Sequence, residues 1–153
     1  DSLEEQSIYW NDDLDLAASM AIKTIKTIRE TDEEIELLPL WREDDDDKEF
    51  METLFKESLA QSDVNEKLVM ESAKNWELER IALMDRILMK MAIAEAKSFP
   101  SIPLKVTLNE YIELSKYYST PKSNGFINGI LDQLFTQMKE DGSIVKMGRG
   151  LIE

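Results

Sequence analysis

The sequence contains no cysteine and no histidine, and it has only five glycines and four prolines among 153 residues. The absence of Cys and His excludes disulfides, thiolate nucleophiles, zinc fingers and histidine-based acid–base chemistry. No apolar run approaches the roughly 18 to 20 residues that span a bilayer, and the first residues do not form a signal peptide. We therefore expect a cytoplasmic protein without a membrane partner, a cofactor or a metal.

Basic residues are also scarce, and the net charge of −14 argues against indiscriminate nucleic-acid binding. The charge is uneven, because residues 1–50 carry 17 acidic and 5 basic residues (−12), whereas residues 51–153 carry 15 and 13 (−2). The run "DDDDK" at 44–48 resembles an engineered protease site, but its acidic neighbours favour a native acidic loop. Since the chain begins at Asp1 rather than Met, we expect some natural N-terminal sequence to be missing.

Apolar residues recur at helical spacing in most of the chain, and hardly any segment alternates as a strand does. The pattern predicts helices over 12–30, 47–62, 63–75, 79–99, 104–118 and 121–139. The fold class is therefore all-α, with antiparallel helices joined by short loops. We expect an acidic N-terminal extension over 1–46 with one helix and a solvated loop (31–46), a helical domain over 47–140, and a tail over 141–153 that the sequence does not predict to pack.

Two helix starts, one connection and one apolar stripe carry the most specific expectations. Asp12 or Asp13 is placed to cap the first helix, and Asp63 with Glu66 resembles a capping box. Trp76 falls in the connection before the helix over 79–99. That helix has the strongest pattern, with a predicted inward stripe of Met84, Ile87, Leu88, Met91 and Ala92.

Catalytic patterns are missing, because no pair of acids points inward at helical spacing and no phosphate-binding glycine loop is present. We therefore predict that the protein is not an enzyme. The Asp85-Arg86 pair lies on the polar flank of its helix, where it forms either a surface ion pair or an exposed contact for a basic partner. Lys105, Asn109 and Lys116 follow on the next helix, and Asn109 either bonds a neighbouring loop or serves a binding site.

The start of the last helix gathers small and polar residues. Thr120 can cap it and Pro121 suits its first position, so free N–H groups there attract phosphate or carboxylate. Gly125 and Gly129 leave one side of the helix bare beside Asn128. The spacing allows either another helix or a nucleic-acid backbone to come close.

Three segments in order, "MDRIL" (84–88), "NEYIELSK" (109–116) and "KSNGFINGILD" (122–132), resemble signatures of the NusB family of bacterial transcription antitermination factors. The resemblance is strong over 84–134 and extends more weakly back to Asp47. It implies a NusB-like helical bundle of two packed helical subdomains. It also implies binding of boxA-type RNA together with the ribosomal protein NusE, as part of the RNA polymerase elongation complex.

The resemblance assigns roles to residues that the sequence pattern leaves open. Asp85, with Arg86 beside it, matches the family's contact with the ribosomal protein. The implied RNA-binding set is Lys105, Asn109, Lys116, Lys122, Ser123, Asn124, Gly125, Phe126 and Asn128, with the ring of Phe126 partly exposed for stacking on a base.

One departure from the family concerns the N-terminal third. Members usually begin with an Arg-rich helix, whereas residues before 47 are acidic and resemble the enlarged N-terminal regions of longer members. If such a helix is missing, RNA affinity should be weak and uncovered apolar surface should favour self-association; alternatively, residues 12–30 replace it. Competing functions are a protein-interaction module that has lost RNA binding, the accessory domain of some RNA methyltransferases, and, more distantly, a carboxylate enzyme.

Overall fold

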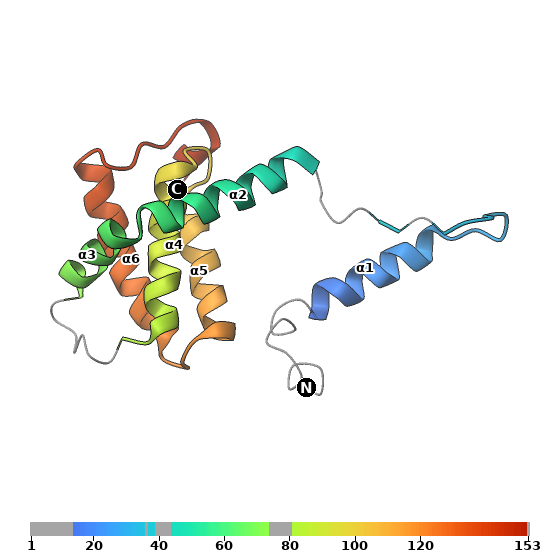
Figure 1. Cartoon of the computed structure of the whole chain (residues 1–153), viewed down its shortest axis with the longest axis horizontal. Coiled ribbons are helices and arrows are strands. Elements are labelled where there is room, and N and C mark those ends of the chain that lie inside the picture. Colours follow the sequence, from blue (N-terminus) through green and yellow to red (C-terminus); the bar gives the residue numbers. More distant parts are fainter. Residues whose placement is uncertain (1–13, 36, 39–43, 74–80, 153) are drawn as a thin grey trace. The chain divides into compact units, whose positions relative to one another are not determined.

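The computed structural model describes residues 14–35, 37–38, 44–73 and 81–152, and these residues contain helices but no strand (Figure 1). The expected helix caps Asp12 and Asp13, and Trp76, lie outside them. The helices are α1 (Leu14–Thr27), α2 (Asp44–Ala60), α3 (Ser62–Ser72), α4 (Leu83–Ser98), α5 (Leu104–Tyr118), α6 (Ser123–Glu140) and the short 3-10 helix η3 (Gly148–Leu151). The all-α prediction is confirmed.

The chain divides into two compact units, residues 1–48 and 49–153. In the first unit, α1 buries none of its residues. Of the predicted apolar positions, Ile25 within α1 is 66% exposed, and Ile28 just after the helix is 42% exposed. After the helix, the N–H of Arg29 donates to the carboxylate of Asp32 at 2.7 Å, which closes a turn.

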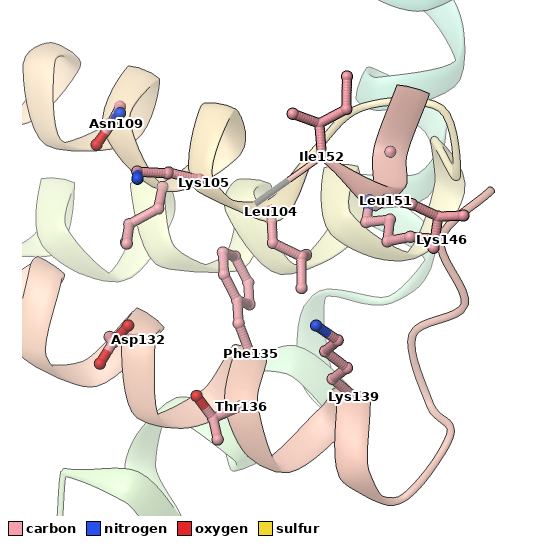
Figure 2. Close-up of a pocket in the computed structure, with 12 residues that line it drawn as sticks. Leu104, Lys105, Asn109, Asp132, Phe135, Thr136, Lys139, Lys146, Leu151 and Ile152 are labelled. Carbon is pink, nitrogen blue, oxygen red and sulfur yellow. The ribbon is translucent and has the colours of Figure 1, made fainter. Parts of the chain in front are cut away.

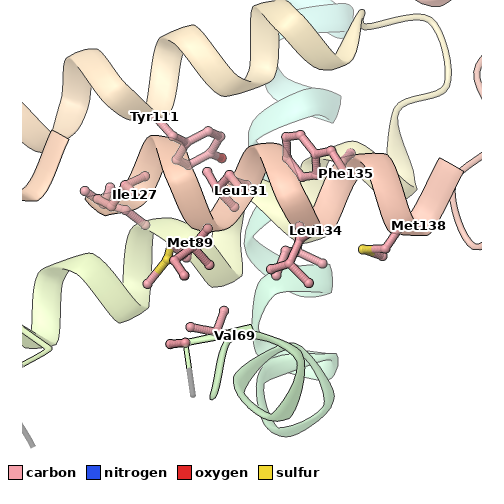
Figure 3. Packing of buried hydrophobic residues seen from close by; sticks show 14 of the residues in the cluster. Val69, Met89, Tyr111, Ile127, Leu131, Leu134, Phe135 and Met138 are labelled. Atoms are coloured by element: carbon pink, nitrogen blue, oxygen red, sulfur yellow. The ribbon is translucent and has the colours of Figure 1, made fainter. Parts of the chain in front are cut away.

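The core of the second unit lies between α3, α4, α5 and α6 (Figure 3). Helix α4 packs against the other three helices of this group. Side chains from all of them meet in one apolar cluster, and burial of such side chains is the main stabilising contribution to a fold. Its buried members include Val69, Met89, Ile93, Tyr111, Ile127, Leu131, Leu134, Phe135 and Met138.

Helix α4 turns a different face inward from the predicted one. Leu88 and Ala92 are buried as expected, but Met84, Ile87 and Met91 are only partly buried. The fully buried face instead includes Met89, Ile93 and Ala96, one residue further along each turn. The prediction followed the large side chains of Met84 and Met91, whereas the small side chains of Ala92 and Ala96 belong to the core cluster.

Two predicted helix starts are wrong. Helix α2 begins at Asp44, so the acidic run predicted to end the loop over 31–46 opens a helix, where negative charge is favoured. Helix α3 has Gln61 at its N-cap without a side-chain hydrogen bond, so Asp63 and Glu66 do not form a capping box. Glu66 instead pairs with Arg86 and Lys90 of α4.

The C-terminal segment packs, contrary to expectation. Helix α6 ends at Asp141-Gly142 as predicted, and Gly142 has a positive φ of 78°. The following chain buries Ile144, and the N–H of Met147 donates to the carbonyl of Pro100 at 2.9 Å. Gly150 is also buried, and a Cβ atom there would lie 2.0 Å from the same carbonyl oxygen. Only glycine fits this contact, so it holds the tail against the loop between α4 and α5.

Candidate nucleic-acid interface

The α5–α6 pair carries most of the predicted RNA-binding residues on one exposed surface. On α5, Lys105, Asn109 and Lys116 are exposed and follow one another at helical spacing. On α6, Gly125 and Asn128 are exposed at a spacing of three residues. We call this surface the α5–α6 face. Prediction and structure agree that these side chains are available to a partner.

The far end of the α5–α6 face is hollowed into a pocket of about 440 Å³ (Figure 2). Lys105 and Asn109 line it from α5, opposite Asp132 and Thr136 of α6. Sequence reasoning did not include Thr136, Lys139 or Lys146, which also line it. The positions 128, 132, 136 and 139 fall on one side of a helix, a signal that could have found the first two of these; nothing in the sequence pointed to Lys146.

Ser123 was predicted to contact RNA, but it is buried, with only 1% of its surface exposed. Its N–H donates to the carbonyl of Thr120 at 2.9 Å, and its hydroxyl accepts from the N–H of Thr120 at 3.2 Å. This reciprocal arrangement closes a turn, so α6 begins at Ser123 rather than at the predicted Pro121. The hydroxyl of Ser123 therefore serves the fold and is turned away from solvent.

Asp85 of α4 accepts hydrogen bonds from this turn. Its carboxylate accepts from the hydroxyl of Ser123 at 2.9 Å and also from the hydroxyl of Ser119. Only 4% of Asp85 is exposed, so the expectation of an exposed acid is wrong. The reason lies in its spacing, because residues 85, 88, 89 and 92 form the buried side of α4. Asp85 thus links the first turn of α4 to the start of α6.

Arg86 lies on the other side of this helix turn and remains accessible. Its guanidinium donates to Glu66 of α3 at 2.7 Å, and its side chain is 42% exposed. Lys90 pairs with the second oxygen of the same carboxylate at 3.2 Å. Arg86 is therefore part of an ion-pair network between α3 and α4, with part of its surface open to solvent.

The remaining predicted contacts differ in accessibility. Lys122 is exposed, and Asn124 is half-buried with its carbonyl oxygen accepting the N–H of Gly125 at 2.7 Å. Phe126 is partly buried and packs against the core cluster, so most of its ring is used in the fold. Lys116 pairs with the exposed Glu113 one turn earlier. Lys122 is consequently the most accessible positive charge at the start of α6.

Gly125 and Gly129 stand out because the fold does not require them. A Cβ atom at either position would meet nothing within 4 Å. Neither glycine has a positive φ, since only Gly142 and Gly148 do. Glycine in a helix costs about 0.5–1 kcal/mol relative to alanine. Two exposed positions of α6 therefore carry glycine without a packing or backbone reason.

Beneath this surface, burial raises the pKa of Glu95, although hydroxyls of Thr107 and Tyr111 nearby favour its charged form. The hydroxyl of Tyr111 donates to Glu95 at 3.2 Å, whereas that of Thr107 has no partner at hydrogen-bonding geometry. Burial also lowers the pKa of Lys146, which Glu95 partly offsets. Glu95 of α4 therefore interacts with Tyr111 of α5 and with Lys146 of the tail below the pocket.

Other kinds of site are not found in the part of the chain that the structure describes. Among those residues no group of three or more acids is arranged to hold a metal ion. No described helix is both long and apolar enough to cross a membrane.

The comparison with known protein families decides the assignment. The model of the NusB family matches residues 12–135, most of the chain. The chain belongs to the NusB family. This family consists of non-enzymatic transcription antitermination factors, in agreement with the expectation that the protein is not an enzyme.

Similar proteins support the assignment over most of the sequence. The transcription antitermination protein NusB of Salinibacter ruber is 38% identical over 142 residues, which cover 89% of each chain. NusB of Dictyoglomus turgidum is 36% identical over 68% of this chain and 70% of its own. A structure of T. maritima NusB superposes with a TM-score of 0.55 at 30% identity, covering 59% of this chain and 63% of that one.

The extent of the NusB match bears on the N-terminal third. Because the match begins at residue 12, it includes α1 and the acidic segment after it. The prediction placed residues 1–46 before the family region, and that separation is not supported. The sequence pattern did not indicate this, because the helix over 12–30 has a single arginine, Arg29, whereas the family's first helix is usually rich in arginine.

Proposed function

We propose that this chain is a transcription antitermination factor that binds boxA-type RNA together with the ribosomal protein NusE and joins the elongating RNA polymerase complex. The observation that carries the proposal is the α5–α6 face, where exposed lysines and amides lie beside two glycines that the fold does not require. Membership in the NusB family supports it independently. Membership in the NusB family fits a cytoplasmic location.

The chemistry of this face suits unpaired RNA. Lys105 and Lys122 supply positive charge for phosphates, while Asn128 can exchange hydrogen bonds with base edges. The bare backbone at Gly125 and Gly129 lets a sugar–phosphate chain approach more closely than any side chain would allow. Since Phe126 is largely committed to the core, stacking on its ring contributes less than the sequence alone suggests.

The roles of Asp85 and Arg86 separate in this proposal. Asp85 is buried and holds the start of α6, so it positions the RNA-binding residues rather than contacting NusE directly. Arg86 of α4 and its partner Glu66 of α3 keep 42% and 21% of their side chains exposed, so a second protein can reach this ion pair. A basic partner would meet Glu66 there, and Arg86 would limit which basic groups can approach.

The test is a fluorescence-anisotropy titration of boxA-type RNA, at two salt concentrations, with and without NusE. Binding should weaken as salt rises, because phosphate contacts release counterions, and it should tighten when NusE is present. Lys122→Glu is expected to weaken RNA binding about tenfold without changing the melting temperature. Lys67→Glu, an equal charge reversal at an exposed position of α3, is the matched control and should have a much smaller effect. Equal losses in both variants would remove Lys122 from the site.

The acidity of the chain favours a second candidate function, a protein-interaction module that has kept the NusB fold and lost RNA binding. The net charge of −14, of which residues 1–50 carry −12, repels phosphate. This candidate predicts that NusE still binds while boxA-type RNA does not bind at any salt concentration. The same titration therefore separates the two functions.

We also propose that the chain self-associates at high concentration. Along α2, Met51, Phe55 and Leu59 recur every four residues and are 49%, 65% and 63% exposed. An exposed apolar row of this kind is a usual site of protein contact. Sedimentation velocity over a hundredfold concentration range should show a rising sedimentation coefficient, and a constant value would rule the association out.

A further inference from the structure

The pocket at the far end of the α5–α6 face has features that no predicted RNA contact explains. Its floor is apolar, and Figure 2 shows Leu104 of α5 and Phe135 of α6 pointing toward each other across it. Leu108 completes the floor, and the exposed Leu151 and Ile152 of the tail border it. A volume of about 440 Å³ lies within the roughly 300–1,000 Å³ typical of small-molecule sites.

Four polar side chains around this floor are not used by the fold, whereas Lys146 donates to the carbonyl of Phe99 at 2.9 Å. The side chains of Lys105, Asn109, Asp132 and Thr136 make no hydrogen bond or ion pair with any other described residue. They approach the pocket from two different helices, which hold them at fixed positions. A few convergent polar groups over an apolar floor are the arrangement that fixes the orientation of a bound ligand.

The charges of the pocket narrow the class of ligand. Lys105, Lys139 and Lys146 make the pocket positive in a chain whose net charge is −14. Asp132 is the only acid among the lining residues, and it faces the same space. A basic peptide would be repelled by the three lysines, and a ligand with acidic groups alone would pair with the lysines and leave the carboxylate of Asp132 without a donor. The pocket fits a ligand that carries an anion together with a hydrogen-bond donor.

A nucleotide with an exocyclic amino group meets these conditions. Its phosphate can pair with Lys105, and its amino group can donate to the carboxylate of Asp132, a contact that distinguishes amino-bearing bases. The amide of Asn109 can both donate to and accept from the base edge. The apolar floor formed by Leu104 and Phe135 suits the flat face of a base.

We propose that this pocket binds one unpaired nucleotide whose base carries an exocyclic amino group, and that this nucleotide belongs to the RNA on the adjoining α5–α6 face. The second half of the proposal rests on the proposed function. The pocket continues that face directly, since Lys105 and Asn109 belong to both. The RNA then extends from Lys122 along α5 and α6 and ends with a base held in the pocket.

The first experiment compares CMP with UMP, whose bases differ in the amino or carbonyl group at C4 and in whether the neighbouring N3 accepts or donates a hydrogen bond. Each is titrated into the full ¹⁵N-labelled chain while the amide signals of Asn109, Asp132 and Thr136 are followed by NMR. CMP should shift these signals in a saturable way and bind about fivefold or more tightly than UMP. Asp132→Asn should abolish this preference, whereas Asp63→Asn, an exposed control on α3, should retain it.

The second experiment uses RNA. A boxA-type RNA extended by one cytidine at either end should bind more tightly than the same RNA extended by uridine, and Asp132→Asn should remove the difference. If the RNA extended by cytidine binds no more tightly than the RNA extended by uridine, the pocket proposal is overturned. The proposed function stays intact in that case, because the boxA-type RNA itself still binds. Loss of all RNA binding, with CMP still bound, overturns the proposed function and the RNA half of the inference.

Two further outcomes count against the proposal. If CMP binds but no RNA extension gains affinity, the pocket takes free nucleotides and the assignment to RNA is wrong. If neither CMP nor UMP shifts the three signals, whereas an acidic peptide of alternating Glu and Leu does, the pocket is a protein-binding site. A melting curve of each variant shows that the comparison is made on folded protein.

Discussion

Gly129→Ala is expected to stabilise the fold and weaken RNA binding at the same time. Gly129 lies within α6, is exposed, and has nothing within 4 Å of where a Cβ would be placed. Alanine is favoured over glycine inside a helix by about 0.5–1 kcal/mol. For a chain of this length, 1 kcal/mol raises the melting temperature by about 2–4 °C. No packing change offsets this gain, because the added methyl group meets only solvent.

The expected loss of binding comes from the same methyl group. If RNA backbone lies against the bare helix, the methyl group displaces it, and a loss of about 0.7 kcal/mol corresponds to a threefold weaker complex. Anisotropy titration measures the affinity and a thermal melt measures the stability of the same sample. Gln137→Ala, an exposed position on the same helix outside the predicted site, is the control for helix propensity.

Each readout can refute a different step. A lower melting temperature would show that Gly129 is needed by the fold, contrary to the open space around it. A higher melting temperature with unchanged RNA affinity would show that RNA does not approach the helix there. Only opposite changes in stability and affinity support both steps.

Three further predictions concern the interior. Gly150→Ala should lower the free energy of unfolding by about 1–3 kcal/mol, because the Cβ of the alanine would lie 2.0 Å from the carbonyl oxygen of Pro100. Denaturant unfolding measures this free energy, and an unchanged midpoint would contradict the contact. Burial raises the pKa of Glu95 above its usual 4.5, so its contribution to stability is present below pH 4.5 and is lost as pH rises through the folded-state pKa. Glu95→Gln should therefore flatten the decline in melting temperature above about pH 4.5, and an identical slope would exclude this group. Asp85→Ala should cost about 2–3 kcal/mol, since the hydroxyls of Ser119 and Ser123 lose the buried carboxylate that accepts from them, whereas Arg86→Ala should cost less than about 1 kcal/mol; equal losses would contradict the burial of Asp85.

The helices were predictable because their apolar spacing is regular and because Pro and Gly mark several ends. Helix α5 spans Leu104–Tyr118 as predicted, with Pro103 just before it. Helix α6 ends where Asp141-Gly142 indicated. Helix ends that depend on charge were less predictable. The acidic run from Asp44 has the composition of a loop, but negative side chains are also favourable at the N-terminus of a helix, and α2 begins there.

The candidate site was predictable only where exposure follows from helical spacing. Lys105, Asn109 and Asn128 are exposed as expected, whereas Ser123 is not. Whether a short polar side chain faces solvent or a buried partner depends on residues distant in sequence, here Asp85, 38 positions away from Ser123. The pocket could not be predicted from the sequence for the same reason. Its wall at Gly150 comes from the C-terminal tail, and the local sequence pattern does not predict that this tail packs.

The turn before α6 shows how folding and binding divide neighbouring residues between them. Successive residues of a helix point about 100° apart, so a buried Ser123 leaves Lys122 on the outside of the turn. The carboxylate of Asp85 holds Ser119 and Ser123 together, which fixes where α6 begins. A buried acid that sequence alone assigns to a protein contact therefore sets the position of the most accessible lysine in the proposed RNA site. Loss of Asp85 should weaken RNA binding through the fold, whereas loss of Lys122 should weaken it directly.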